Sequence, residues 1–155
     1  MTILFYAPKS GQWLEALQSC IKGVVPKKEI DIIRTARGLS RRLSRPGFDL
    51  DVIVLIIPTK NEFKNILSFR HLLLDRRIIL ILPDSDDNTI RHAHSLFPRF
   101  IDYVDGNKSD VSAVLQKMLN YIFEQKKRLI QQWASPVAKR NGTKSAMPGS
   151  EPEPC

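Results

Sequence analysis

Apolar residues along this chain occur in short continuous runs that alternate with segments of helical periodicity. Five runs rich in Ile, Leu and Val are typical of strands, and they cover residues 2–7, 29–35, 48–58, 76–83 and 99–104. After each run, apolar residues recur at steps of three and four, which predicts five helices, the last over residues 109–133. Unbroken apolar strands are covered on both faces, so we expect a parallel sheet between two layers of helices.

The alternation of strands and helices predicts a doubly wound α/β fold. Right-handed crossovers leave few topologies for five parallel strands, and we expect the order 2-1-3-4-5 in a three-layer, flavodoxin-like sandwich with an extended C-terminal helix. In such sheets ligands bind at the carboxyl ends of the strands. Those ends are therefore where candidate chemistry is sought.

The third predicted strand resembles part of a known family. The segment "FDLDVIVLIIP" (48–58) is similar to the third strand of receiver domains from response regulators of two-component signalling. In that family an acidic region and an apolar strand lead to the phospho-accepting Asp, and a Pro follows. The segment "FIDYVDGNKSDVSAVLQKML" (100–119) is similar to the family's fifth strand and last helix. The resemblance covers residues 2 to about 123 and implies a receiver-like fold.

The same resemblance implies a phosphoryl site whose chemical groups are missing. Receivers use paired acids to hold Mg²⁺, an acceptor Asp, a Ser or Thr, and a Lys. With Pro58 as the anchor, the acceptor position falls on Val54, and shifts of one or two residues meet no carboxylate. The other pocket positions fall on residues without the required chemistry: Ala7, Pro8, Leu82, Pro83 and Gly106. We expect a pseudo-receiver outside any phosphorelay chemistry, with no enzymatic activity, metal or cofactor.

Two weaker chemical readings concern the same edge of the sheet. Asp84, Asp86 and Asp87 follow the fourth strand and could hold a metal, but carboxylates at a helix N-terminus are also stabilised by the helix dipole, and we favour capping. The segment "APKSGQW" (7–13) is similar to a flavodoxin-type phosphate loop but contains one glycine. A small flavodoxin-like enzyme therefore remains an alternative.

Basic residues dominate the chain and gather on the second predicted helix. The net charge is +8, the sequence pI is about 9.7, and the excess lies before residue 134. The arginines of this helix and its entry are Arg34, Arg37, Arg41, Arg42 and Arg45. They form either a solvated face or an anion-facing patch for nucleic acid, an acidic protein or a membrane surface. The helix lacks aromatic residues, which disfavours single-strand recognition.

The last predicted helix is longer than the sheet requires. Leu129, Ile130 and Trp133 continue an apolar stripe beyond the covering part, which indicates a partner helix or self-association, or an extension that folds back onto the domain. We therefore divide the chain into a receiver-like domain (1–123), a helical extension (124–133) and a tail (134–155). The tail is poor in apolar residues and rich in Pro, Ser and Gly, and we expect disorder.

No apolar run approaches the roughly 20 residues that span a bilayer, and we expect a cytoplasmic protein. The resemblance, together with the missing pocket groups, implies a phosphorylation-independent protein-interaction module in bacterial signalling. It would bind through the surface of the fourth helix, the fifth strand and the fifth helix, which is the usual output surface of the family it resembles. Nucleic-acid binding through the arginine-rich helix is the alternative from another class.

Overall fold

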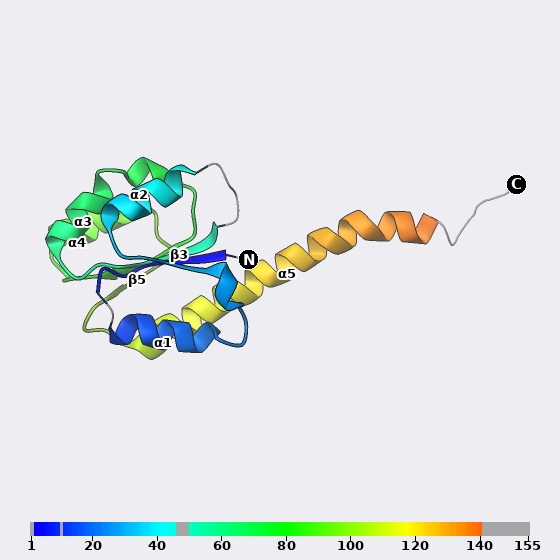
Figure 1. The fold of residues 1–155 in the computed structure, drawn as a ribbon, viewed down its shortest axis with the longest axis horizontal. Helices are drawn as coiled ribbons and strands as arrows, with labels where there is room; N and C mark the ends of the chain where they lie inside the picture. Colours follow the sequence, from blue (N-terminus) through cyan, green and yellow to red (C-terminus); the bar gives the residue numbers. More distant parts are fainter. Residues whose placement is uncertain (1, 10, 46–49, 141–155) are drawn as a thin grey trace, which may run out of the picture. The chain divides into compact units, whose positions relative to one another are not determined.

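The computed structural model describes the backbone of residues 2–9, 11–45 and 50–140, and side chains as far as residue 133. The chain divides into two compact units, Met1–Leu119 and Asn120–Cys155. The elements of the fold, shown in Figure 1, are β1 (Thr2–Tyr6), α1 (Gln12–Ile21), β2 (Ile30–Ile33), α2 (Ala36–Ser44), β3 (Leu50–Ile56), α3 (Lys60–Leu67), β4 (Ile78–Leu82), α4 (Asp87–His94), β5 (Phe100–Tyr103) and α5 (Lys108–Arg140). Two short 3₁₀ helices, η1 (Lys27–Glu29) and η2 (Arg70–Leu72), precede β2 and β4.

The five strands form one parallel sheet in the order β2-β1-β3-β4-β5, which confirms the predicted topology. In the middle of the sheet, Val54 of β3 is in register with Phe5 of β1 and with Ile79 of β4. Because all strands run the same way, their carboxyl ends meet at one edge. That edge is where the pocket of a receiver would lie.

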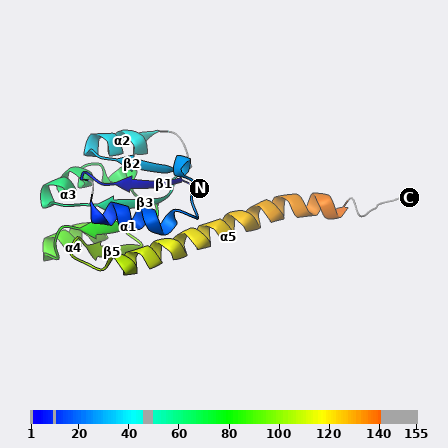
Figure 2. The same ribbon diagram turned by 60° about the horizontal axis from the view of Figure 1, so that its bottom comes forward.

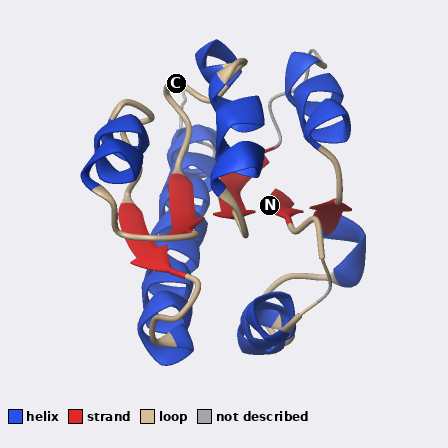
Figure 3. Cartoon of the chain, turned by 90° about the vertical axis from the view of Figure 1, so that its left-hand side faces the viewer, coloured by secondary structure: helices blue, strands red, loops and turns tan. Residues whose placement is uncertain are grey.

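Helices cover both faces of the sheet, which explains the unbroken apolar strands. Helices α2, α3 and α4 form one layer, and α1 with the first part of α5 forms the other (Figure 1). In Figure 2 the α1 layer is turned toward the viewer, and Figure 3 shows the row of strands between the helices. Side chains alternate along β3, so Ile53 and Leu55 join the core under α2–α4, whereas Val54 faces the α1 and α5 layer.

Local sequence signals set several helix ends. Thr35 accepts a hydrogen bond from the backbone N–H of Gly38 at 3.0 Å, and Thr59 accepts one from Glu62 at 3.2 Å. These N-caps satisfy backbone donors that the first helical turn leaves unpaired. The helices α2 and α3 therefore begin directly after Thr35 and Thr59.

The third helix differs from its prediction. The helical spacing of apolar residues from Phe63 to Leu74 predicts one continuous helix, but α3 ends at Leu67 and the chain leaves helical dihedrals at Phe69. This break lets η2 form, and it buries both Phe69 and Leu73 against the core cluster. The burial of two large side chains outweighs the continuation of the helix.

The last helix is longer than predicted. Its backbone is helical to Arg140, seven residues beyond the predicted end at Trp133. The rest of the predicted tail, residues 141–155 with Cys155, lies outside the described residues. Within the part of the chain that is described, no helix is both long and apolar enough to cross a membrane.

Candidate functional site

The acceptor position of the receiver resemblance lies inside the sheet. Val54 is fully buried, and its strand neighbours in register are the apolar Phe5 and Ile79. Strand β3 continues through Leu55 and Ile56 beyond it. A carboxylate at this position would be surrounded by apolar side chains.

The positions predicted for metal ligands and for the hydroxyl group are also apolar or backbone-bound. Ala7 is fully buried, its N–H donates to the Ile33 carbonyl at 2.9 Å, and its own carbonyl accepts from Arg34 Nη1 at 3.3 Å. Leu82 is fully buried at the end of β4. Pro8 and Pro83 are half-buried and carry no side-chain donor or acceptor.

Gly106, at the predicted lysine position, closes a tight turn after β5. Its N–H donates to the Tyr103 carbonyl at 2.7 Å. A Cβ atom here would lie 3.0 Å from the Tyr103 carbonyl oxygen and 2.8 Å from Cγ of Asp102. The Asp102 carboxylate is held in place because it accepts the Tyr103 N–H at 2.7 Å. The turn therefore has no room for a side chain at residue 106.

The lysine nearest to Gly106 in the sequence, Lys108, contacts an aromatic ring. Nζ of Lys108 lies 5.1 Å from the centre of the Trp13 ring, which is the geometry of a cation–π contact. The indole N–H of Trp13 donates to the Val104 carbonyl at 2.8 Å. Trp13 thus connects the start of α1 to the end of β5. Helical spacing predicts that Trp13 lies on the first helix, but no sequence pattern predicted this contact.

A buried tyrosine joins β1 to α3. The hydroxyl of Tyr6 donates a hydrogen bond to Oε2 of Glu62, in the first turn of α3. Tyr6 is fully buried, and desolvation raises its pKa above the ordinary tyrosine range, with the hydrogen bond and the charge of Glu62 acting in the same direction. The phenol therefore stays protonated and donates.

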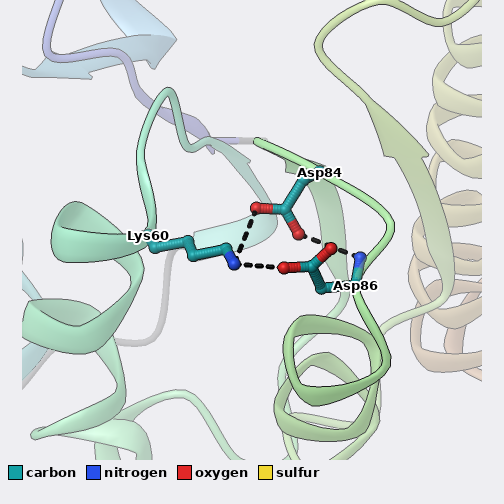
Figure 4. A network of polar contacts seen from close by, with 3 residues as sticks. All are labelled: Lys60, Asp84 and Asp86. Carbon is teal, nitrogen blue, oxygen red and sulfur yellow. Dashed lines mark hydrogen bonds and ion pairs between the residues drawn. The ribbon is translucent and has the colours of Figure 1, made fainter.

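Three charged groups at the carboxyl edge, Lys60, Asp84 and Asp86, form a network of polar contacts, as Figure 4 shows. Lys60 forms ion pairs with Asp86 and, at 3.8 Å, with Asp84. Oδ1 of Asp84 also accepts the backbone N–H of Asp86 at 3.0 Å. This last bond is the main cause that lowers the pKa of Asp84, and Thr89 and Lys60 contribute. The bond to Asp86 raises the pKa of Lys60, together with the charges of both carboxylates.

This network bears on the two readings of the acidic segment. Asp86 is the N-cap of α4 but makes no side-chain capping bond, whereas Asp84 accepts a backbone N–H in the turn before the helix. The described part of the chain holds no group of three or more His, Cys, Asp or Glu side chains arranged for a metal. The ammonium of Lys60 provides the positive charge between these two acids.

A groove of about 370 Å³ lies between α3 and α4 beside this network. Phe63 and Leu67 supply its apolar lining, and Lys60, Lys64 and His92 supply basic groups. Thr89, the one polar side chain in the described core, also lines it. The sequence prediction did not include this groove, because its two walls come from helices that are separated by β4.

The five arginines of the predicted patch do not all remain available. Nε of Arg42 donates to Asp31 at 3.0 Å, and Arg34 donates to the Ala7 carbonyl. Arg37, Arg41 and Arg45 are exposed along α2 and its C-cap. Within the described part of the chain, Arg37, Arg41 and Arg45 are therefore exposed without such a bond, and Arg34 is exposed with one nitrogen bound to the Ala7 carbonyl.

The predicted stripe on the last helix is exposed in its own unit. More than half of the surface of Leu129, Ile130 and Trp133 is accessible to solvent. Phe123 and Tyr121 are also more than half exposed, and neither residue was part of the predicted stripe. At 100° per residue, Phe123 lies on the same side of α5 as Ile130, so helical spacing would have included it.

Comparisons with known proteins bear on the fold. No family model matches the sequence, and no curated protein matches it. The fold is similar to a CheY-like response regulator receiver domain protein from Methanospirillum hungatei, with a TM-score of 0.60, 15% identity, 82% of this chain covered and 97% of the other. It is also similar to the signal receiver domain of a signal transduction histidine kinase from Syntrophus aciditrophicus (TM-score 0.57, 13% identity, 79% and 92% covered).

A third similar structure is the N-terminal domain of an uncharacterized protein from Wolinella succinogenes, with a TM-score of 0.58 and 12% identity over 81% of this chain and 98% of the other. At such low identities these matches establish the fold. The chain has the receiver fold, as its sequence predicted, with a long C-terminal helix added.

Proposed function

We propose that this chain is a pseudo-receiver that accepts no phosphoryl group and acts in bacterial two-component signalling by binding other proteins. The observation that carries the proposal is the burial of Val54 between Phe5 and Ile79 at the acceptor position. Phosphoryl transfer to a receiver needs a carboxylate nucleophile and a divalent cation that meet at the carboxyl edge. Two of the acids at this edge, Asp84 and Asp86, are instead paired with Lys60.

A phosphodonor experiment tests the loss of chemistry. The purified protein is incubated with acetyl phosphate and Mg²⁺, and its intact mass is measured, with an active receiver domain as positive control. We expect no added phosphoryl group, and we expect Mg²⁺ to leave the Tm unchanged. A phosphoryl group that hydroxylamine releases at neutral pH would contradict the proposal, because hydroxylamine cleaves the acyl phosphate of a carboxylate and leaves Ser and Thr phosphoesters intact.

The surface proposed for protein binding is formed by α4, β5 and the first part of α5. Strand β5 is the edge of the sheet, so one side of its backbone has no strand partner in the described part of the chain. Helices α4 and α5 lie on opposite faces of the sheet beside it (Figure 1). Arg91 on α4 and Lys117 on α5 are exposed on these helices.

A matched pair of variants tests this surface. Tagged protein is purified from its native cells, and partners are identified by mass spectrometry. We expect Arg91→Glu with Lys117→Glu to lose a partner that the wild type retains. The control is Lys27→Glu with Lys28→Glu, which changes the net charge equally at exposed residues of η1. Retention of every partner by the first variant would exclude this surface.

Nucleic-acid binding through α2 is a second candidate, supported by the three exposed arginines Arg37, Arg41 and Arg45. Phosphate contacts of this kind weaken steeply with salt. In a gel-shift experiment with duplex DNA, Arg37→Glu with Arg41→Glu should reduce both the affinity and the salt dependence, whereas the η1 control pair should not. Equal losses in the two variants would indicate an effect of net charge alone.

A further inference from the structure

A second hollow lies at the amino ends of the strands, opposite the carboxyl edge of the sheet. Its volume is about 440 Å³, and it is formed by the turns that enter β4 and β5. The residues that line it are Leu74, Asp75, Arg76, Phe97 and Arg99. It is therefore built from the amino ends of two adjacent strands.

Phe97 has an unusual backbone conformation for its residue type. Its φ of 51° lies in the left-handed region, and 75% of its surface is exposed. It follows the end of α4, where its N–H donates to the His94 carbonyl at 3.1 Å, and Pro98 comes next. Glycine or asparagine suits such a turn, because a Cβ atom is disfavoured there. Neither the turn nor the core requires a phenyl ring at this position.

The turn before β4 also combines a left-handed backbone with an exposed apolar side chain. Asp75 also has a left-handed backbone, with a φ of 64°, and the adjacent Leu74 is 42% exposed. Two left-handed turns thus place an exposed aliphatic and an exposed aromatic side chain in the lining of one hollow. Apolar side chains gathered in this way are typical of contact surfaces rather than of an ordinary solvated loop.

Arginines flank these apolar side chains. Nε of Arg76 donates to the Leu72 carbonyl at 2.8 Å, which fixes the side chain and leaves its terminal nitrogens as donors. Arg99 is exposed, and its backbone N–H is held by the Ile78 carbonyl at 2.8 Å. Within the described ranges, neither arginine forms an ion pair. Aromatic residues and arginine are the residue types enriched in protein interfaces.

The lining distinguishes between possible occupants. A single-stranded nucleic acid needs successive aromatic platforms, but the hollow has one ring. A second copy bound through the same surface would place arginines opposite arginines on a chain of net charge +8. A partner that presents a carboxylate beside an apolar side chain is complementary to both features.

We propose that Leu74, Arg76, Phe97 and Arg99 form a docking surface for an acidic protein segment, in which an apolar side chain packs on Phe97 and Leu74 and a neighbouring carboxylate pairs with Arg99 and Arg76. We call these four residues the Phe97 surface. It lies in the loops that enter β4 and β5, next to the α4–β5–α5 surface, and does not depend on the loss of phosphoryl chemistry. It goes beyond the proposed function by giving the chemistry of a partner.

The test uses short fluorescein-labelled peptides and fluorescence anisotropy. One peptide alternates glutamate, phenylalanine and serine, and a second has lysine in place of glutamate. We expect the wild type to bind the glutamate peptide and not the lysine peptide, with an affinity that falls as salt is added. Equal binding of both peptides, or no binding of the glutamate peptide, overturns the proposal.

Two variants and two matched controls locate the binding. Phe97→Asn introduces a residue that tolerates the left-handed backbone, so the Tm of the variant should stay at or above that of the wild type. Phe97→Asn and Arg99→Glu should each weaken binding of the glutamate peptide by roughly tenfold or more. Val24→Asn, at another exposed apolar side chain, and Lys28→Glu, with the same charge change as Arg99→Glu, should leave it unchanged.

One further outcome would overturn the proposal, and two others would assign the surface to a different occupant. Unchanged affinity in Phe97→Asn overturns the proposal outright. Binding of oligothymidylate that is lost in Phe97→Asn would assign the surface to single-stranded nucleic acid. Self-association in sedimentation velocity that is lost in the same variant would assign it to a second copy of this chain.

Discussion

The hydroxyl of Tyr6 donates a hydrogen bond to the carboxylate of Glu62, and this bond joins the end of β1 to the first turn of α3. Tyr6 is fully buried, so its hydroxyl has no water to replace the carboxylate. Glu62 is half-buried, and its backbone N–H is capped by Thr59. The pair therefore fixes the position of α3 beside the carboxyl edge of the sheet.

The Tyr6→Phe variant should lower the free energy of unfolding by about 1.5 kcal/mol, because it removes a hydrogen bond to a charged acceptor. The measurement is urea unfolding followed by circular dichroism. Tyr121→Phe is the control, because Tyr121 is exposed and should change the free energy little. Equal effects of the two substitutions would show that the bond to Glu62 contributes nothing.

The same pair should make stability depend on pH in the alkaline range. Burial raises the pKa of Tyr6 above the ordinary value near 10, so above that pH the unfolded chain loses a proton that the folded chain retains. The contribution of this pair to the free energy of unfolding is therefore fully present below about pH 10 and falls as the pH rises further. Unfolding is measured from about pH 9 to about pH 11.5, a range that includes the ordinary tyrosine pKa near 10. Over this range the free energy of unfolding should fall less steeply for Tyr6→Phe than for the wild type. Parallel curves would contradict the assignment.

The sequence predicted the sheet but not the contacts at its edge, and the reason is physical. Unbroken apolar strands such as β4 specify burial on both faces, and this property is local to each strand. The partners of Tyr6 and Lys60 depend on how α3 lies against β1 and on the turn before α4. The left-handed backbone of Phe97 could not be predicted either, because an aromatic residue rarely adopts this conformation.

The Val54→Asp variant should not become a phospho-acceptor, and it should be much less stable. Its carboxylate would be buried without a donor, which costs about 3 kcal/mol or more. Val54→Ala is the control for lost packing, with an expected cost of about 2 kcal/mol. Unfolding in urea measures both costs, and the intact mass after treatment with acetyl phosphate reports labelling. Labelling of Val54→Asp would show that the acceptor position still has a working pocket.

The Gly106→Ala variant should lower the free energy of unfolding by about 1 kcal/mol. Its methyl group would displace the Asp102 carboxylate, which accepts the N–H of Tyr103. Asp102→Ala removes that obstacle, so the cost of Gly106→Ala should be smaller in the Asp102→Ala background. A double-mutant cycle measured by urea unfolding gives the coupling directly. Strict additivity would locate the strain in the Tyr103 carbonyl instead.

The exposed apolar residues of α5 should promote self-association or binding of a partner helix. Leu129 and Trp133 are one turn apart on the helix, and each exposes more than half of its surface. A helix with such a stripe is stabilised when a second helix covers the apolar side chains. Sedimentation velocity over a range of protein concentrations should show association that Leu129→Ser with Trp133→Ser abolishes. The control is Gln131→Ser with Gln132→Ser, which changes polar residues of the same exposed segment. A monomer at every concentration would leave a heterologous helix as the partner, whereas association unaffected by the first variant would exclude this stripe from the contact.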